Sequence, residues 1–312
     1  MKVVWSAAKQ VSGEILVGTA SWTDKTLIAS HRFYPRKASN PEARLRYYAE
    51  NFPIVEVDST YYFPPTEQNA IAWVNRTPVH FTFHIKAYSL LTKHPTRPNS
   101  LHKDLLPMVA SEHQDKRSLY ASHLPEQAID EVWSRFAAAL MPLHSAGKLG
   151  VIHFQFPEWF IPGSESRNYI IEVQERLPDY RIAVEFRNAL WLNENNLERT
   201  LGFLEKHQIP ITSVDMPQGF PSSLPPVAAA TAPDLAYVRF HGRNRAEWNK
   251  PHATATPRFA YKYEEAELAE WVPKLQSLAS ETKKVHVLMN NCYEDYAVAN
   301  AKQLAAMLSG GD

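Results

Sequence analysis

The chain has 312 residues, with 33 Lys and Arg balanced by 33 Asp and Glu, one cysteine and only 10 glycines. No two glycines stand in the G-x-G order that a Rossmann dinucleotide site requires. The one G-x-x-x-x-G run, Gly13 to Gly18, continues with Thr19 and Ala20, where a phosphate-binding P-loop needs Lys and then Ser or Thr. Both nucleotide-cofactor motifs are therefore excluded, and the cofactor stays unknown.

The zero net charge removes the global positive field that nonspecific nucleic-acid binding usually requires. The lone Cys292 cannot form an internal disulfide, and the first 20 residues lack the pattern of a secretory signal. The apolar runs are far shorter than the roughly 20 residues that span a bilayer. We therefore predict a cytoplasmic protein that does not partner a membrane; the oligomeric state is left open.

In chain order, eight short segments rich in β-formers alternate with segments of helical periodicity. The predicted strands are Ile15–Ala20, Ile54–Asp58, His80–Lys86, Leu149–Phe156, Arg181–Phe186, Pro210–Asp215, Leu235–His241 and Lys284–Asn290. The predicted helices are Pro41–Phe52, Thr66–Asn75, Glu126–Ala146, Arg167–Leu177, Glu194–His207, Glu264–Glu281 and Glu294–Leu308. The alternation predicts an α/β fold, a TIM-type (β/α)8 barrel forming a single domain over residues 1–312, with a short N-terminal extension 1–13. A doubly wound open sheet is the alternative.

Three long connections, 93–124, 216–234 and 242–263, leave the C-terminal ends of strands three, six and seven. Barrels place their chemistry at that end, and loops of this length act as lids or binding loops or are variable surface. The connection 216–234 contains five prolines, and we interpret it as a surface loop. No helix is predicted after strand six, so the barrel is expected to be irregular there.

Polar residues recur in pairs spaced i and i+2 at the C-terminal ends of the strands. The pairs are Glu56/Asp58, His84/Lys86, His153/Gln155, Glu185/Arg187, Ser213/Asp215 and Arg239/His241, with Asn290 closing strand eight. This spacing puts both members on one face of a strand, while the residues between them, such as Phe186, Val214 and Phe240, are expected to pack against the helices. Ionisable groups inside a barrel must be paired or functional, so the pairs predict either a polar ligand-binding mouth or a structural ion network.

Charge suggests what such a mouth binds. The connection 242–263 carries Arg243, Arg245, Lys250, Arg258 and Lys262 against Glu247, together with the aromatic residues Trp248, Tyr261 and Tyr263. Barrels often hold phosphate groups with the loops after strands seven and eight, and guanidinium groups match phosphate or carboxylate oxygens. The interpretation is an anion site, although a solvated basic loop is an equally good reading.

Several short segments near these strand ends also resemble one known family. They include Val17-Gly18-Thr19-Ala20-Ser21-Trp22, Val55-Glu56-Val57-Asp58-Ser59-Thr60-Tyr61-Tyr62, Leu91-Thr92-Lys93-His94, Phe154-Gln155-Phe156-Pro157, Ala183-Val184-Glu185-Phe186-Arg187, Tyr237-Val238-Arg239-Phe240-His241-Gly242-Arg243 and Asn290-Asn291. From about residue 15 to 308 the chain resembles the YecE-like proteins, domain of unknown function 72. The resemblance implies a TIM-type barrel and brings no established activity.

Three functions remain open. The leading hypothesis is an enzyme that uses acid–base chemistry on a small phosphorylated or carboxylated molecule. Its candidate catalytic residues are Glu185, Asp215, Lys86 and Glu56, and its candidate binding residues are Arg187, Arg239, His241, Arg243, Gln155, Asn290, Asp58 and Trp22. The second is metal-assisted phosphodiester cleavage on nucleic acid; it ranks lower because no metal-ligand motif is present, and no metal ligand is assigned. The third is a noncatalytic ligand sensor or scaffold.

Overall fold

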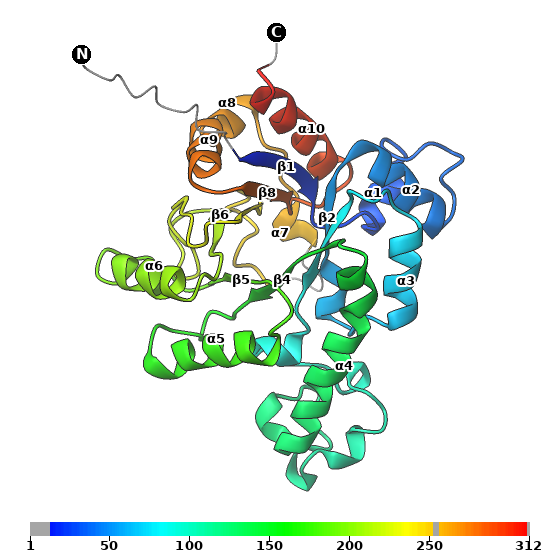
Figure 1. Ribbon diagram of the computed structural model, residues 1–312, viewed down its shortest axis with the longest axis vertical. Helices are drawn as coiled ribbons and strands as arrows, with labels where there is room; N and C mark the ends of the chain where they lie inside the picture. Colours follow the sequence, from blue (N-terminus) through cyan, green and yellow to red (C-terminus); the bar gives the residue numbers. More distant parts are fainter. Residues whose placement is uncertain (1–12, 252–255, 311–312) are drawn as a thin grey trace, which may run out of the picture.

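The computed structural model describes residues 13–251 and 256–310, and its eight parallel strands curl into a nearly closed barrel (Figure 1). The strands are β1 (Glu14–Thr19), β2 (Ile54–Val57), β3 (Thr82–Lys86), β4 (Leu149–Gln155), β5 (Ile182–Glu185), β6 (Thr212–Asp215), β7 (Ala236–Phe240) and β8 (Lys284–Met289). They pair in the order β5-β4-β3-β2-β1-β8-β7-β6. The ring closes through one bridge, Val184 to Ile211, and the Val184 amide donates to the Pro210 carbonyl at 3.0 Å. The predicted (β/α)8 barrel is confirmed; of the predicted extension 1–13, only Gly13 is within the described residues.

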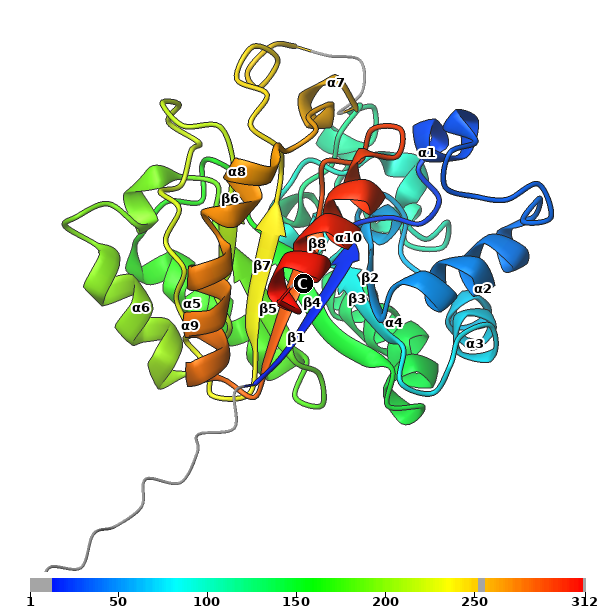
Figure 2. The same ribbon diagram turned by 90° about the horizontal axis from the view of Figure 1, so that it is seen from above.

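Helices cover the outside of this barrel (Figure 2). They are α1 (Lys25–Ser30), α2 (Pro41–Asn51), α3 (Glu67–Asn75), α4 (Glu126–Ser145), α5 (Ser164–Arg176), α6 (Leu197–Lys206), α7 (Thr256–Phe259), α8 (Glu265–Ala269), α9 (Val272–Glu281) and α10 (Tyr296–Leu308). All seven predicted helical segments are helical, but the one predicted over Glu264–Glu281 is divided into α8 and α9. Pro273 lies in the first turn of α9 and cannot donate to the carbonyl four residues earlier, so a continuous helix would lose a hydrogen bond there.

The segment between β6 and β7, residues 216–235, contains no helix, as predicted. Its prolines remove backbone donors, and side chains supply the hydrogen bonds instead. The amide of Gln218 donates to the carbonyls of Met216 and Leu224, and the Ser223 hydroxyl donates to the Pro217 carbonyl. The connection is thus ordered without regular structure.

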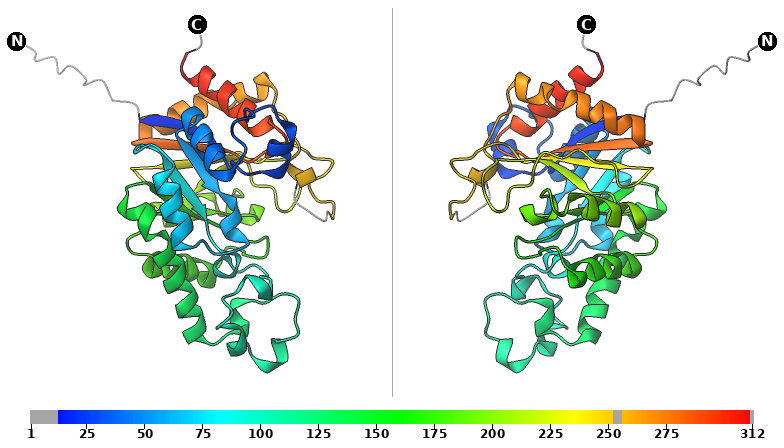
Figure 3. Two further views of the ribbon diagram at one scale, coloured as in Figure 1. Left: turned by 90° about the vertical axis from the view of Figure 1, so that its right-hand side faces the viewer. Right: turned by 90° about the vertical axis from the view of Figure 1, so that its left-hand side faces the viewer.

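The loops that leave the C-terminal ends of the strands gather on one side of the barrel, where α1 and α7 also lie (Figure 2). The insertion after β3 folds into short 3-10 turns joined by the bridge Thr96–Leu119 and projects beside the start of α4 (Figure 3). Among the described residues, no helix has the length and apolar character that crossing a membrane requires.

Local sequence signals explain why α2 begins where it does. The Asn40 side chain accepts a hydrogen bond from the Ala43 amide, Pro41 occupies the first turn, and Glu42 places a negative charge there. The helix then buries Leu45 and Tyr48 against the barrel.

Tyr48 ties β1 to β2 where the two strands share a single register pair, Thr19 with Val55. Its hydroxyl accepts from the Thr19 amide at 2.9 Å and donates to the Ile54 carbonyl at 3.1 Å. The side chain is completely buried. One phenol therefore replaces part of the missing strand ladder.

Replacing Tyr48 with Phe is expected to lower the free energy of unfolding by about 1–3 kcal/mol, because the buried Thr19 amide loses its partner. Urea unfolding measures the effect. The control is Tyr47→Phe on the same helix, since no hydrogen bond of the Tyr47 hydroxyl is found within the described chain. Equal stability of the two variants would contradict the role given to Tyr48.

Candidate functional site

The register of the strands decides which polar residues share the barrel interior. Residues that are direct partners in parallel strands point to the same face. The partners Glu56/His84, Lys86/His153, Gln155/Glu185 and Tyr237/His286 therefore lie on the inner face, together with Arg239. For these strands the predicted polar inner face is confirmed.

Arg239 is the centre of a fully buried ion network. Its Nη1 lies 2.8 Å from Glu185 Oε2 and its Nη2 lies 2.7 Å from Glu56 Oε1, so one guanidinium links β2, β5 and β7. The Tyr237 hydroxyl donates to Glu56 Oε2 at 2.9 Å. His153 lies between the two carboxylates, with Nδ1 3.4 Å from Glu56 and Nε2 3.2 Å from Glu185.

Both carboxylates are ionised despite their burial. Burial alone would raise the pKa of Glu185, but the charges of Arg187 and Arg239 outweigh it and hold this pKa well below its usual range. The pKa of Glu56 is likewise lowered, since Arg239 and His153 outweigh the effect of its burial. Neither side chain is exposed to solvent. Their geometry suits them to hold cations in place, and a strongly lowered pKa makes them weak bases.

Glu185 also fixes the residues at the mouth end of the network. Its Oε1 lies 2.6 Å from Arg187 Nε and 3.1 Å from His241 Nε2. Asn290 contacts His241 Nδ1 through its side-chain amide at 2.8 Å. Burial and the charge of Arg187 lower the pKa of His241 to about 3, so this imidazole is neutral near pH 7. Four predicted site residues are thus brought together.

Lys86 and Asp58 form a second group on the rim of the mouth. Lys86 Nζ lies 2.7 Å from Asp58 Oδ1 and 4.8 Å from the centre of the Tyr61 ring. Gln155 is half-buried on the inner face, and its amide makes no hydrogen bond within the described part of the chain. These polar groups can therefore still reach a ligand.

His94, which was not predicted, belongs to the same rim. The Thr92 hydroxyl donates to the Ser89 carbonyl at 3.0 Å and therefore accepts from His94 Nδ1 at 2.8 Å. This pattern assigns the unprotonated nitrogen to Nε2. Burial and the charges of Lys86 and Arg187 lower the pKa of His94 to about 3. A neutral imidazole thus lies within the field of two cations.

Arg258, from α7, adds a third cation. The Arg258 and Arg187 guanidinium carbons lie 5.7 and 5.9 Å from the centre of the Trp248 ring. Among the residues that the structure describes, no carboxylate lies within ion-pair distance of Arg258, and its Nε is buried without a hydrogen-bond partner. Burial and the charges of Arg239 and Arg258 lower the pKa of Arg187 even though Glu185 is adjacent. Arg239 and Arg258 therefore both repel Arg187.

The pair Ser213/Asp215 is the exception to the predicted pattern. In β6, Thr212 and Val214 are the partners of Tyr237 and Arg239 on the inner face, so Asp215 points outward. The prediction that Asp215 lies inside the mouth, with Val214 packed against the helices, is wrong.

Outside the barrel, Asp215 is fully occupied by partners of the helix layer. It accepts from the Tyr263 hydroxyl at 2.6 Å and from Trp271 Nε1 at 2.7 Å, and it pairs with Arg243 at 2.7 Å. Arg243 also contacts Glu267 and Glu270. This cluster anchors the loop after β7.

Trp22, predicted as a binding residue, is buried in the outer core. Its ring packs edge-on against Trp73 at 5.9 Å and Phe83 at 6.3 Å. These contacts give Trp22 a packing role. The remaining predicted anion ligands, Arg239, His241 and Arg243, each have carboxylate partners within the chain.

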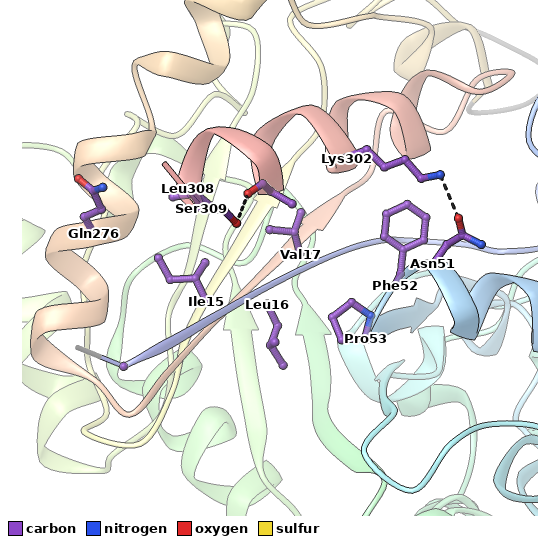
Figure 4. Close-up of a pocket in the computed structure, with 12 residues that line it drawn as sticks. Ile15, Leu16, Val17, Asn51, Phe52, Pro53, Gln276, Lys302, Leu308 and Ser309 are labelled. Carbon is purple, nitrogen blue, oxygen red and sulfur yellow. Dashed lines mark hydrogen bonds between the residues drawn. The ribbon is translucent and has the colours of Figure 1, made fainter. Parts of the chain in front are cut away.

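Two surface hollows lie at the opposite, N-terminal ends of the strands. One, of about 570 Å³, lies between the start of β1 and residues near α2, α9 and α10, including Phe52 and Lys302 (Figure 4). Lys302 Nζ donates to Asn51 Oδ1 at 3.0 Å there. The other, of about 500 Å³, precedes β5 and β6. None of the lining residues is among the predicted site residues, and barrel chemistry lies at the other end of the strands.

No group of three His, Cys, Asp or Glu side chains suited to a metal ion is found within residues 13–251 and 256–310. The carboxylates of the barrel interior contact cations and ring nitrogens, as described above.

The closed ring of parallel strands and the charged groups at their C-terminal ends define a TIM-type barrel with an ionised mouth. The chain belongs to the family described as "Protein of unknown function DUF72", which matches residues 16–311. It is 31% identical over 297 residues to the UPF0759 protein YunF of Bacillus subtilis (strain 168), covering 94% of each chain.

Solved structures of the same family share the fold. A DUF72 family protein from Enterococcus faecalis V583 is 28% identical, with a TM-score of 0.77 and 96% of each chain covered. Another from Thermotoga maritima MSB8 is 28% identical, with a TM-score of 0.73, covering 95% of this chain and 99% of its own. The family resemblance noted in the sequence is thus confirmed.

Proposed function

We propose that this protein is an enzyme that uses acid–base chemistry on a small anionic molecule, phosphorylated or carboxylated, bound at the mouth of the barrel. One observation carries the proposal: Lys86, Arg187 and Arg258 converge there from three different strand ends. Of these three cations, Lys86 and Arg187 have carboxylate partners among the described residues and Arg258 has none. Arg187 shares its partner Glu185 with Arg239.

An anion would relieve the repulsion between Arg187 and Arg258. Arg187 is already held by Glu185, so little side-chain entropy is lost when its outer nitrogens bind an oxyanion. Lys86 adds a second charge from β3, which is separated from β5 by the single strand β4. A ligand held by such fixed groups would be small, because the chain as a whole carries no net charge to attract a polyanion.

His94 supplies the acid–base group in this proposal. It is neutral because it is partly buried and lies near two cations, Lys86 and Arg187. A bound anion would cancel part of that positive field and move the pKa of His94 back toward neutral pH, where proton transfer is most effective. Binding of the anionic substrate would thus bring His94 into the pKa range in which it can accept and donate a proton.

The predicted catalytic carboxylates take supporting roles in this scheme. Glu185 positions Arg187 and His241, and Glu56 holds Arg239, which in turn holds Glu185. Asp215 anchors the loop that carries Trp248 and leads to Arg258. Lys86 is the one predicted catalytic residue that we keep in contact with the substrate.

A thermal-shift titration with inorganic phosphate and pyrophosphate tests the binding step. At ten times its dissociation constant, a ligand should stabilise the wild type by about 1.4 kcal/mol. Arg187→Gln should lose this shift. The matched control is Arg199→Gln on α6, an exposed arginine for which no ion pair is found in the described chain, and it should retain the shift. Equal shifts in both variants would overturn the proposal.

The proton step has its own measurement. We expect bound phosphate to raise the pKa of His94 from its low value in the free protein. Nuclear magnetic resonance titration of the imidazole measures this pKa with and without phosphate. A pKa that does not move when phosphate is bound would remove His94 from the mechanism. Recovery of a copurified ligand unchanged after incubation would favour the noncatalytic sensor instead.

A further inference from the structure

We propose that the anion carries a nucleobase: the ligand is a nucleoside phosphate, free or at the end of a single strand, whose base stacks on an aromatic row beside the cations. The aromatic row consists of Tyr62, Tyr61, His94 and Trp159. This inference rests on the proposed function, because Lys86 and Arg187 are taken to bind the phosphate.

The row is continuous and crosses three neighbouring strand ends. Ring centres are 5.0 Å apart for Tyr61 and Tyr62, 5.3 Å for Tyr61 and His94, and 6.0 Å for His94 and Trp159. The planes meet at 88°, 82° and 66°. At such angles no two rings of the row stack face to face on each other.

The ends of the row are exposed. Trp159 is 58% exposed and Tyr62 is 52% exposed, and Phe63 beside it is 56% exposed. Neighbouring large apolar groups on a surface mark an interaction site, whereas single ones need no explanation. By contrast, Trp248 and Tyr263 in the loop after β7 are 3% and 2% exposed, so that loop offers little aromatic surface for stacking.

Positive charge accompanies the row along its length. Lys86 Nζ lies over the Tyr61 ring, and the charges of Lys86 and Arg187 both act on His94. The charge of Arg97 acts on Tyr62 at the far end. A phosphate on Lys86 and Arg187 therefore places an attached base within reach of the rings. Aromatic rings interleaved with cations are how proteins bind single-stranded nucleic acid and its units.

Calorimetric titration with adenosine 5′-monophosphate, ribose 5-phosphate and adenosine separates the contributions of base and phosphate. Wild type should bind the nucleotide at least tenfold more tightly than ribose 5-phosphate or adenosine. Trp159→Leu should weaken nucleotide binding at least fivefold. The affinity of the same variant for ribose 5-phosphate should stay within twofold of the wild-type value. Phe203→Leu on α6 is the matched aromatic control and should change neither.

The outcomes separate the two proposals. If nucleotide and ribose 5-phosphate bind equally in an Arg187-dependent manner, the nucleobase inference is overturned and the proposed function stands. If no compound binds, both fall. A 5′-phosphorylated deoxyadenosine pentamer is compared with the mononucleotide to identify the source of the ligand. If the pentamer binds tenfold more tightly and Tyr62→Leu loses this gain in affinity, the ligand is the end of a single strand. Equal affinities identify the free nucleotide.

Discussion

Acidification from pH 7.5 to pH 5 is expected to lower the free energy of unfolding by at least about 4 kcal/mol. The cause is a set of buried histidines that stay neutral in the folded barrel. The pKa of His241 is lowered to about 3 by burial and by Arg187, and that of His286 to about 3 by burial and by Lys284. Each contributes about 2 kcal/mol over this interval.

The sign follows from proton binding. The unfolded chain protonates each histidine below about pH 6.5, while the folded state does not until about pH 3, so unfolding takes up protons and stability falls as pH falls. His84 acts in the same direction, because burial and His286 lower its pKa. Glu56 and Glu185, whose folded pKa values are also lowered, add a further loss below about pH 4.5.

Urea unfolding at several pH values measures the effect, and His286→Leu tests its origin. Neither nitrogen of His286 has a hydrogen-bond partner within the described residues, so this substitution leaves no donor unsatisfied. The variant should lose about 2 kcal/mol of the difference between pH 7.5 and pH 5. An unchanged pH dependence would show that His286 does not contribute in this way.

Arg239→Met is expected to destabilise the protein by about 3–5 kcal/mol, because it leaves Glu56 and Glu185 as buried charges without their shared partner. The control is Arg135→Met on α4, which breaks ion pairs of similar geometry at the surface. That change should cost less than about 1 kcal/mol.

The destabilisation can be assigned to the network even if Arg239→Met does not fold. Adding Glu56→Gln to the variant removes one of the uncompensated charges and should restore part of the stability, so the two substitutions are not additive. Equal costs for Arg239→Met and Arg135→Met would contradict a structural role for the buried network.

The periodicity of the sequence was enough to predict the barrel and most of its inner face. Glu56, His153, Glu185 and Arg239 each stand on a strand whose alternate residues are apolar, so the two faces differ clearly. Once the strands pair in parallel, residues on the inner face must meet.

Strand β6 could not be assigned in this way. The predicted strand Pro210–Asp215 places apolar Ile211 and Val214 three residues apart, on opposite faces, with Thr212 and Ser213 in between. A two-residue period cannot choose between those faces. Only the pairing with β7 puts Thr212 and Val214 inside and leaves Asp215 outside.

The aromatic row and His94 were missed for a related reason. Tyr62, His94 and Trp159 lie in connections without periodicity, where sequence does not separate an exposed ring from a packed one. The Leu91–His94 segment, noted only as part of a family resemblance, was the one available signal for His94. The contacts of Thr92 and the nearby charges of Lys86 and Arg187 define its chemistry.

We propose above that Lys86 and Arg187 form an anion site at the mouth of the barrel. A crystal structure of the protein soaked in tungstate tests it most directly, because the anomalous signal of tungsten locates the anion without ambiguity. We expect a tungstate ion within hydrogen-bond distance of the Arg187 guanidinium and Lys86 Nζ, and we expect it to be absent from Arg187→Gln crystals soaked in the same way. Tungstate bound only elsewhere on the protein, with the mouth occupied by water alone, would contradict it.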